Sequence, residues 1–489
     1  MKKSIFFALL FISIAFAVTN ISAQWQPEVR MTNDSAISLT SFGNARCIAA
    51  NGDVIHAVWY SGDGVNQGSW EIYYKRSTDK GVTWSEAVNL SNADSVRYNP
   101  AIAVSGSYVH VVWYDRRDGN HEEYYRRSTD GGITWDPEIR LTNNSSISAH
   151  PSIAASGLNV HIAWQEYRDG NWEIYYKQSA DGGVNWTADR RLSNTSGHSY
   201  MPAVAVSGSF VHVAWCDSVP GNWKVFYKRS SDGGINWGAD TPLSNNTSDS
   251  KYATLAVSGS NVHIVWIEIR SVSMGYLHYK RSVNNGVNWD ADVHLSKTTF
   301  NNEYPSIAVN GSVLHLVFMR PVKTNWEIFY LTSVNNGTKW GSDVTLTNYA
   351  SYSSVPSVAV SGSSVHVLFR DDRDGNYEIY YKRFKSSAAG PEGFTNNNPE
   401  LPKTYFMSQN YPNPFNPVTK ISFNVPKQAY VSLKVFDPLG REVSTLVNEV
   451  REPGSYSVDF NGAELTSGVY FYRLQSAEFT DIKRMTLIK

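Results

Sequence analysis

One structural unit recurs seven times in this chain, with a period close to 51 residues. A strand-like segment of the type V-H-V-x-W marks each copy, preceded by a glycine-centred turn and followed by a segment of the type E-I-Y-Y-K-R-S. The histidine of the marker stands at His56, His110, His161, His212, His263, His315 and His366. A unit of this size cannot bury its apolar face alone, so successive copies must stack against one another.

A turn of the form S-x-[DN]-x-G-x-x-W, first seen at Ser77–Trp84, occurs six times. Its tryptophan opens a fourth strand of the type W-x-x-[DE]-V-x-L-[ST]-N, which occurs seven times because one copy stands alone at Trp25–Asn33. The seventh unit ends near Phe384 without this turn. Closure into a ring explains both observations and leaves no sheet edge unpaired. We therefore predict an all-β, seven-bladed β-propeller over residues 24–387, in which the N-terminal strand pairs with Glu378–Lys382.

Composition excludes several classes of protein. The 43 basic and 44 acidic residues give a net charge of −1, which argues against a nucleic-acid partner. Charged residues are 18% of the chain, below the usual value of about 25%. Two cysteines, Cys47 and Cys216, cannot build a disulfide framework, and no Cys/His spacing indicates zinc. We expect no metal and no cofactor.

The N-terminus has the layout of a secretory signal peptide. Lys2 and Lys3 precede an apolar run from Ile5 to Val18, and a polar stretch ends at Ser22-Ala23. The run has 14 residues, whereas a spanning helix needs about 20. We predict that residues 1–23 are a signal peptide and that the exported chain has no membrane span. A bare membrane-anchoring helix is the alternative.

The chain changes character after the repeats. Residues 388–403 are small, polar and rich in Pro and Gly, which predicts a linker. Residues 404–489 hold short alternating segments separated by turns such as Asp437-Pro438, which predicts a small immunoglobulin-like β-sandwich. Its most distinctive motifs are NYPNPFNP (Asn410–Pro417), VFDPLGREV (Val435–Val443), PGSYSVDF (Pro453–Phe460), SGVYFYRL (Ser467–Leu474) and a terminal KRMTLIK.

These motifs closely resemble the type A C-terminal sorting domain of the type IX secretion system. The resemblance implies the secretion machinery as a partner, passage across the outer membrane, and release or attachment at the cell surface. It also implies that this module is usually removed. A substrate-binding sandwich is the alternative for this segment.

The six repeated turns resemble the Asp-box of the sialidase-like (BNR) propellers in turn type, tryptophan and position in the repeat. An aspartate in such a turn accepts hydrogen bonds from backbone amides, and glycine supplies a positive φ. We interpret Asp79, Asp130, Asp181 and Asp232 as structural residues for this reason. The resemblance implies that these turns lie on the face opposite the ligand.

A residue that is present in every repeat unit is more readily explained by the structure of the unit than by a single functional site. The seven histidines occur once per unit, so we interpret them as packing or hydrogen-bonding positions rather than catalytic ones. Acids or their replacements stand two residues after each strand-ending aromatic, at Ser61, Asp115, Glu166, Asp217, Glu268, Arg320 and Asp371. Arginines two residues further on (Arg117, Arg168, Arg270 and Arg373) predict ion pairs with four of these acids.

A single binding site must use positions where the units differ. Arg320 and the neighbouring Arg370 suggest a pair able to bind a carboxylate bidentately. The complete set of ligand-binding candidates is Arg97, Tyr98, Tyr200, Asp217, Tyr252, Glu268, Tyr304, Arg320, Arg370 and Asp371. Trp70, Trp172, Trp223 and Trp326 are candidates for stacking on sugar rings. Packing against the flanks of the units is the alternative role for these aromatic residues.

The resemblance to sialidases implies an arginine triad, a tyrosine nucleophile assisted by glutamate, and an aspartate acid/base. The nearest match to their F/Y-R-I-P motif is Arg97-Tyr98-Asn99-Pro100, in which the arginine comes one residue early, so the catalytic residues stay unassigned. We predict a secreted or cell-surface propeller that recognises extracellular carbohydrate. An exo-α-sialidase or related glycoside hydrolase is one alternative, and a protein-interaction or adhesion propeller is another.

Overall fold

The computed structural model describes residues 24–385 and 405–489, apart from 43–45, 64–69, 92–94, 220, 246, 272–273, 297–300, 411, 452–453 and 477–478. The predicted signal peptide and linker lie outside these described residues. Within them the secondary structure consists of strands, with no helix. The chain divides into two compact units, Met1–Phe394 and Thr395–Lys489, and each unit has its own apolar core.

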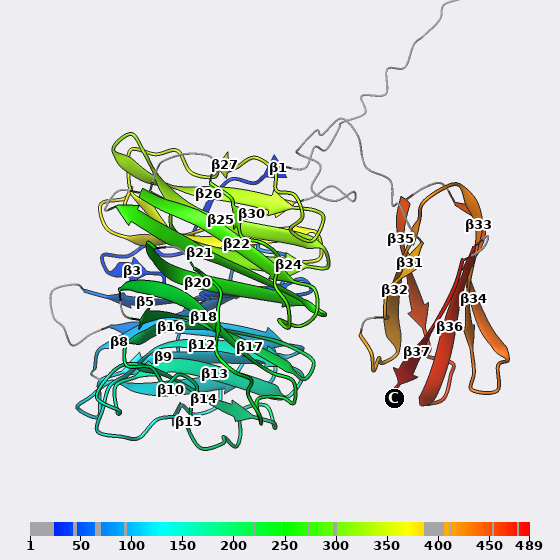
Figure 1. Cartoon of the computed structure of the whole chain (residues 1–489), viewed down its shortest axis with the longest axis horizontal. Coiled ribbons are helices and arrows are strands. Elements are labelled where there is room, and N and C mark those ends of the chain that lie inside the picture. Colours follow the sequence, from blue (N-terminus) through cyan, green and yellow to red (C-terminus); the bar gives the residue numbers. More distant parts are fainter. Residues whose placement is uncertain are drawn as a thin grey trace, which may run out of the picture. The chain divides into compact units, whose positions relative to one another are not determined.

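The described part of the first unit contains seven antiparallel sheets, which follow one another in chain order from blue to yellow in Figure 1. The innermost strands of the first to seventh sheets are β4 (Ile48–Asn51), β8 (Arg97–Ser105), β12 (Ser148–Ser156), β16 (Ser199–Ser207), β20 (Asp249–Ser258), β24 (Glu303–Asn310) and β28 (Ser353–Ser361). A short strand, β3 (Ile37–Leu39), precedes β4 and pairs with the same neighbour.

Each innermost strand pairs with a second strand and the second with a third. The second strands are β5 (Val54–Gly62), β9 (Tyr108–Asp115), β13 (Asn159–Glu166), β17 (Phe210–Val219), β21 (Asn261–Ser271), β25 (Val313–Val322) and β29 (Ser364–Asp371). The third strands are β6 (Glu71–Ser77), β10 (Glu122–Ser128), β14 (Glu173–Ser179), β18 (Asn222–Ser230), β22 (Met274–Ser282), β26 (Asn325–Ser333) and β30 (Glu378–Lys385).

Two-residue outer strands complete the sheets. In the first six sheets they are β7 (Val88–Asn89), β11 (Ile139–Arg140), β15 (Arg190–Arg191), β19 (Thr241–Pro242), β23 (Val293–His294) and β27 (Val344–Thr345). In the seventh sheet, β1 (Gln24–Trp25) and β2 (Val29–Arg30) occupy this place, and the blue β1 lies next to β30 in Figure 1.

The N-terminal segment closes the sheet formed by the last repeat. Trp25 pairs with Phe384, and Val29 pairs with Tyr381, so the predicted pairing of the two ends of the repeat region is confirmed. The innermost strands also contact one another in chain order, and β28 contacts β4. The seven sheets therefore surround a common axis.

In each sheet a histidine is hydrogen-bonded to a tyrosine, and the ring of that tyrosine packs against a tryptophan of the next sheet. In the second sheet, His110 Nδ1 and Tyr125 Oη are 2.6 Å apart, and the Tyr125 ring packs edge-on against Trp186 of the third sheet. All seven repeat histidines make this bond to a tyrosine. Trp25 makes the equivalent contact with Tyr330, with ring centroids 5.0 Å apart. The structural interpretation of the histidines agrees with this geometry.

The second unit contains two antiparallel sheets that share one apolar core, which includes Phe423, Leu433 and Tyr472. One sheet has the order β31 (Phe406–Met407), β32 (Val418–Val425), β35 (Gly454–Asn461). The other has the order β34 (Glu442–Arg451), β33 (Ala429–Phe436), β36 (Gly468–Ser476), β37 (Phe479–Leu487). The alternating burial along β32 and β33 is that of strands with one buried face.

Candidate functional site

The innermost strand of the first sheet is interrupted in a way that the others are not. Between β3 and β4, the described residues 40–42 and 46, which we call the crossing segment, reach both neighbouring sheets. Thr40 Oγ1 donates to the carbonyl of Val355 at 2.8 Å, and Ser41 Oγ donates to the carbonyl of Pro100 at 2.6 Å. The crossing segment therefore lies across one end of the axis, the end at which second strands lead into third strands.

The other six innermost strands carry a bulge at the same level, with one residue at positive φ. These residues are Asn99, His150, Met201, Tyr252, Tyr304 and Val355. A non-glycine residue in this region of φ is uncommon, and for a β-branched residue it indicates strain. The bulge residues differ between sheets and touch one another: Asn99 Nδ2 lies 2.9 Å from His150 Nδ1, and the Tyr252 and Tyr304 ring centroids are 5.0 Å apart. The opening of the axis at this end, which we call the mouth, is therefore lined by different residues on each sheet.

A pocket of about 250 Å³ opens at this mouth. It lies between the sixth sheet, the seventh sheet and the crossing segment. Its lining, which we call the mouth pocket, consists of Phe42, Glu303, Tyr304, Met319, Trp326, Tyr352, Ser354, Val355, Arg370 and Tyr377. Five aromatic rings, one guanidinium and one carboxyl group therefore face a common space.

Arg370 is the cation of the mouth pocket. Its guanidinium carbon lies 4.5 Å from the centre of the Phe42 ring and 5.1 Å from that of Tyr377, and Nε donates to Ser354 Oγ at 3.0 Å. Burial lowers the pKa of Arg370, while nearby tyrosines oppose this effect. Among the described residues no carboxylate forms an ion pair with it, so the aromatic rings and the serine hold the guanidinium in place.

Glu303 and Tyr304 bring a carboxyl group and a phenol hydroxyl to the mouth pocket. Burial raises the pKa of Glu303, although Asn301 Nδ2 donates to its carboxylate at 2.6 Å. Tyr304 is hydrogen-bonded to Tyr252, and burial raises the pKa of both tyrosines. A carboxyl group in such surroundings holds its proton to a higher pH than a solvated one.

The structure brings together four of the residues singled out from the sequence. Arg370, Tyr304 and Trp326 line the mouth pocket, and Tyr252 contacts Tyr304. Asp371 follows Arg370 in β29 and therefore points to the opposite face of the strand. It is fully buried and accepts from Arg373 at 2.7 Å.

The other two candidate arginines do not reach the mouth pocket. Arg97 is fully buried and makes ion pairs of 2.8 Å with both Glu71 and Asp115. Arg320 pairs with Asp343 at 2.7 Å, and its guanidinium carbon stacks 3.8 Å from the centre of the Phe329 ring. The three arginines thus have separate partners, and the pairing of Arg320 with Arg370 on a single ligand does not occur in this arrangement.

Arg320 instead performs the structural role that arginines of other sheets perform. Arg168 stacks 4.3 Å from the centre of the Tyr175 ring and pairs with Asp189 at 2.6 Å, as Arg320 does with Phe329 and Asp343. The four predicted ion pairs between strand-end acids and following arginines are present. Glu268 also lies 2.8 Å from His278 Nε2. Asp217 has no such arginine and accepts from Ser199 Oγ at 2.8 Å.

The remaining aromatic candidates pack against one another on other sheets. Tyr98 lies 6.0 Å from Trp70 between ring centroids. Tyr200 lies between Trp172 and Trp223, at 5.7 and 5.3 Å. None of these five residues lines the mouth pocket.

The Asp-box aspartates are held within their own turns. Asp130 Oδ1 accepts from the backbone amides of Ile133 and Thr134 at 3.0 and 2.9 Å, and the Thr134 side chain lowers the pKa of Asp130 further. Asp79, Asp181 and Asp232 accept in the same way. Among the described residues, no three His, Cys, Asp or Glu side chains gather in a way that suits a metal ion.

Sequence reasoning missed Phe42, Glu303 and the crossing segment. One signal was available: 31 positions separate Trp25 from His56, whereas 26 separate Trp84 from His110. The extra length precedes β4, and among the described residues of this stretch Phe42 and Arg46 reach the fifth, sixth and seventh sheets. Glu303 had no comparable signal, because it is an ordinary acid at the start of a strand.

Comparison with known proteins agrees with the repeat architecture. The model of the BNR repeat-like domain matches residues 10–197 and 119–316, which together span more than half of the chain. The chain belongs to this BNR repeat-like family. The first unit is a β-propeller of the sialidase-like (BNR) type, as the Asp-box turns predicted.

Among curated relatives, the xyloglucanase Xgh74A of Acetivibrio thermocellus is 24% identical over 242 residues. The match covers 47% of this chain and 23% of the relative, so the chain spans under a quarter of that protein's length. Among solved structures, the polysaccharide lyase Uly1 is similar with a TM-score of 0.53 and 9% identity, over 74% of this chain and all of the other. The phage phi92 endosialidase has a TM-score of 0.47 and 10% identity, over 78% and 72% of the two chains.

The C-terminal segment also has a family. A secretion system C-terminal sorting domain matches residues 409–489, so the resemblance to the type IX sorting domain is confirmed. The protein is exported by that system and is secreted or associated with the outer surface. In the part of the chain that the structure describes, no helix is long and apolar enough to cross a membrane.

Proposed function

We propose that this BNR-family propeller recognises an extracellular carbohydrate that carries a carboxylate, and that the mouth pocket binds it. The observation that carries the proposal is the Arg370 guanidinium, which faces a pocket of about 250 Å³ without a carboxylate partner among the described residues. Arginine binds carboxylates bidentately and is weakly hydrated, which suits a half-enclosed site. The rings of Tyr304, Trp326, Tyr352 and Tyr377 offer flat apolar surfaces for the faces of a sugar. Relatives named as a xyloglucanase and a polysaccharide lyase support a carbohydrate ligand.

Binding to a glycan array, followed by calorimetry with the best acidic glycan, tests the proposal. We expect Arg370→Met to weaken binding at least tenfold, because it removes the charge and keeps most of the stem. Arg270→Met is the matched control, because Arg270 is half-exposed and pairs with Glu268 away from the mouth pocket. Equal affinity of wild type and Arg370→Met would contradict the proposal. Capture of a protein partner without any retention of glycans would favour the adhesion alternative.

Hydrolysis of a glycoside at the same pocket is the second candidate function. It is favoured by Glu303, whose raised pKa suits a general acid, next to the paired hydroxyls of Tyr304 and Tyr252. If the protein hydrolyses glycosides, we expect it to release an aryl group from an aryl α-sialoside or a related glycoside. The Glu303→Gln variant should lose this turnover. Absence of turnover across a glycoside panel, together with retention on the array, would decide for binding alone.

We infer that the seven sheets are the blades of one closed ring over residues 24–387. The pairing of β1 and β2 with β30 and the contact between β28 and β4 support this inference. We further infer that residues 1–23 are a signal peptide, that residues 388–403 are a linker, and that residues 404–489 form an immunoglobulin-like sandwich used for sorting. Mass spectrometry of the secreted protein tests both ends: a chain that starts far from Gln24 would contradict the signal-peptide boundary.

A further inference from the structure

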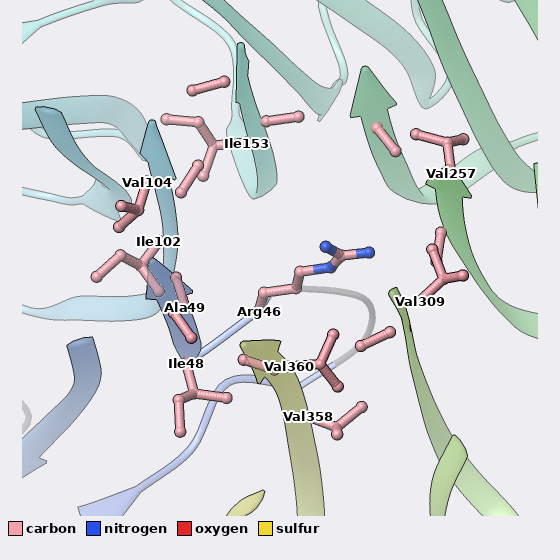
Figure 2. Close-up of a pocket in the computed structure, with 18 of the residues that line it drawn as sticks. Arg46, Ile48, Ala49, Ile102, Val104, Ile153, Val257, Val309, Val358 and Val360 are labelled. Carbon is pink, nitrogen blue, oxygen red and sulfur yellow. The ribbon is translucent and has the colours of Figure 1, made fainter. Parts of the chain in front are cut away.

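A second cavity, separate from the mouth pocket, lies on the axis of the first unit. Its volume is about 220 Å³, and all seven innermost strands contribute to its lining. The lining side chains are alanine, valine and isoleucine with one exception, Arg46. Figure 2 shows the Arg46 side chain extended into the middle of this channel, with residues such as Val104, Ile153 and Val257 around it.

Arg46 has polar partners in the channel but no counter-charge. Its Nη2 atom donates to the carbonyl of Leu255 at 2.6 Å and approaches that of Ile307 at 3.5 Å. No carboxylate among the described residues forms an ion pair with it, and burial lowers its pKa. The carbonyls supply dipoles, yet the full positive charge of the guanidinium remains unneutralised in a space lined by aliphatic groups. The Arg46 side chain is only partly exposed, and a charge in such surroundings is costly unless an opposite charge joins it.

The channel also presents backbone amides. In an antiparallel pair, alternate residues of an edge strand turn both N–H and C=O away from their partner strand. Ile102 is such a residue in β8, because its N–H donates outward to the carbonyl of Arg46. Val104, two positions further on, has the same orientation and lines the channel, and the equivalent residues of the other sheets line it too. The backbone groups of this row therefore turn away from the second strands, towards the axis side of each sheet.

We propose that this channel binds a small monovalent anion, of the size of chloride or formate, between the Arg46 guanidinium and the outward-facing amides. The lining argues against a glycan, because Arg46 is the one polar side chain among the lining residues and the aliphatic groups offer no partners for sugar hydroxyls. The anion neutralises the charge of Arg46, the one charged side chain among the lining residues of the channel. It thereby holds the crossing segment, which carries Arg46, to the fifth and sixth sheets. This site is independent of the mouth pocket and of the carbohydrate that the pocket is proposed to bind.

Bromide diffraction on crystals of the chain from Gln24 onward tests the proposal directly. We expect an anomalous peak within about 3.5 Å of the Arg46 guanidinium, a normal distance for a hydrogen-bonded anion. Bromide peaks elsewhere on the protein, with none at Arg46, would overturn the proposal. This measurement needs no variant, so it decides the question even if substitutions at Arg46 do not fold.

Thermal unfolding gives an independent measurement in solution. At fixed ionic strength, we expect the Tm of the wild type to rise as chloride replaces gluconate, whose hydroxyl groups find no hydrogen-bond partners in the aliphatic lining. An anion that binds only the folded state stabilises it by mass action. Arg46→Met should lose this chloride-specific rise, while Arg270→Met should keep it. The same chloride dependence in Arg46→Met and wild type would show that the guanidinium only seals the channel through its carbonyl contacts.

Discussion

Glu123 occupies a position that the other six sheets fill with an aliphatic side chain. The equivalent residues are Ile72, Ile174, Val225, Leu277, Ile328 and Ile379, each 0% exposed, and Glu123 is 0% exposed as well. Neither carboxyl oxygen of Glu123 has a hydrogen-bond partner among the described residues. Burial, aided by the charges of Glu166 and Glu122, raises the pKa of Glu123 well above its ordinary value. We predict that Glu123→Leu stabilises the first unit.

The size of the effect follows from two contributions and depends on pH. Leucine has about two more apolar groups than glutamate, because apolar carbons replace the carboxyl group, and their burial is worth roughly 1–2 kcal/mol. The substitution also removes an unpaired buried polar group, whose presence costs about 1–3 kcal/mol. The folded pKa of Glu123 is raised, so the folded state binds the proton more tightly than the unfolded state. The wild type therefore loses stability as pH rises from about 4.3 towards the folded pKa, by roughly 1.4 kcal/mol per unit. The difference in unfolding free energy between Glu123→Leu and the wild type should therefore grow by the same amount per pH unit.

Urea unfolding of both proteins at several pH values between 4.5 and 7.5, on the order of one unit apart, measures this difference. Glu123→Gln separates the contributions, because it removes the titration and leaves the polar group. Glu122→Leu is the matched control: Glu122 accepts from Arg140 at 2.7 Å, so its loss should destabilise the protein. A stability gain for Glu123→Leu that does not change with pH, or a loss at neutral pH, would refute the reasoning.

Three further outcomes are expected. Gly183→Ala should lower the Tm by several degrees, because the new Cβ would overlap Tyr125 Oη and φ is +87°; an unchanged Tm would contradict the proposed fit between sheets. Trp25→Ala should destabilise the closing strand by roughly 2–4 kcal/mol, in the range for a partly buried tryptophan, and faster proteolysis near Gln24 is the measurement. Burial lowers the pKa of repeat histidines such as His212 to about 4, so the unfolded state binds more protons between pH 4 and 6.5. Near-UV circular dichroism should therefore show unfolding as pH falls through this window, and an intact signal at about pH 4 would argue against buried neutral histidines.

Much of the fold follows from the sequence because the repeat reports the same local environment seven times. The step between histidines, the six turns and the isolated strand at Trp25 together predict the sheets and the pairing of the two ends of the repeat region. The ion pairs of acids with arginines two residues later also follow, because the period of a strand places both on one face. These features depend on neighbours within one sheet or on adjacent sheets.

The candidate site follows only in part. Arg370, Tyr304 and Trp326 were selected because they differ between units, yet Arg97 and Arg320 were selected on the same ground and are bound in structural ion pairs. A repeat pattern does not show whether an unusual residue faces the axis or replaces a structural neighbour.

The sequence by itself determined the repeated scaffold, since short-range pairing and a period near 51 residues specify it. Only the tertiary structure decided the mouth pocket and the channel, because Phe42 and Arg46 meet residues of the fifth to seventh sheets more than 200 positions away in the chain. The contact between β28 and β4 brings the first and last sheets together. The sequence predicts that the two ends pair, but no local pattern shows which side chains then meet at the axis.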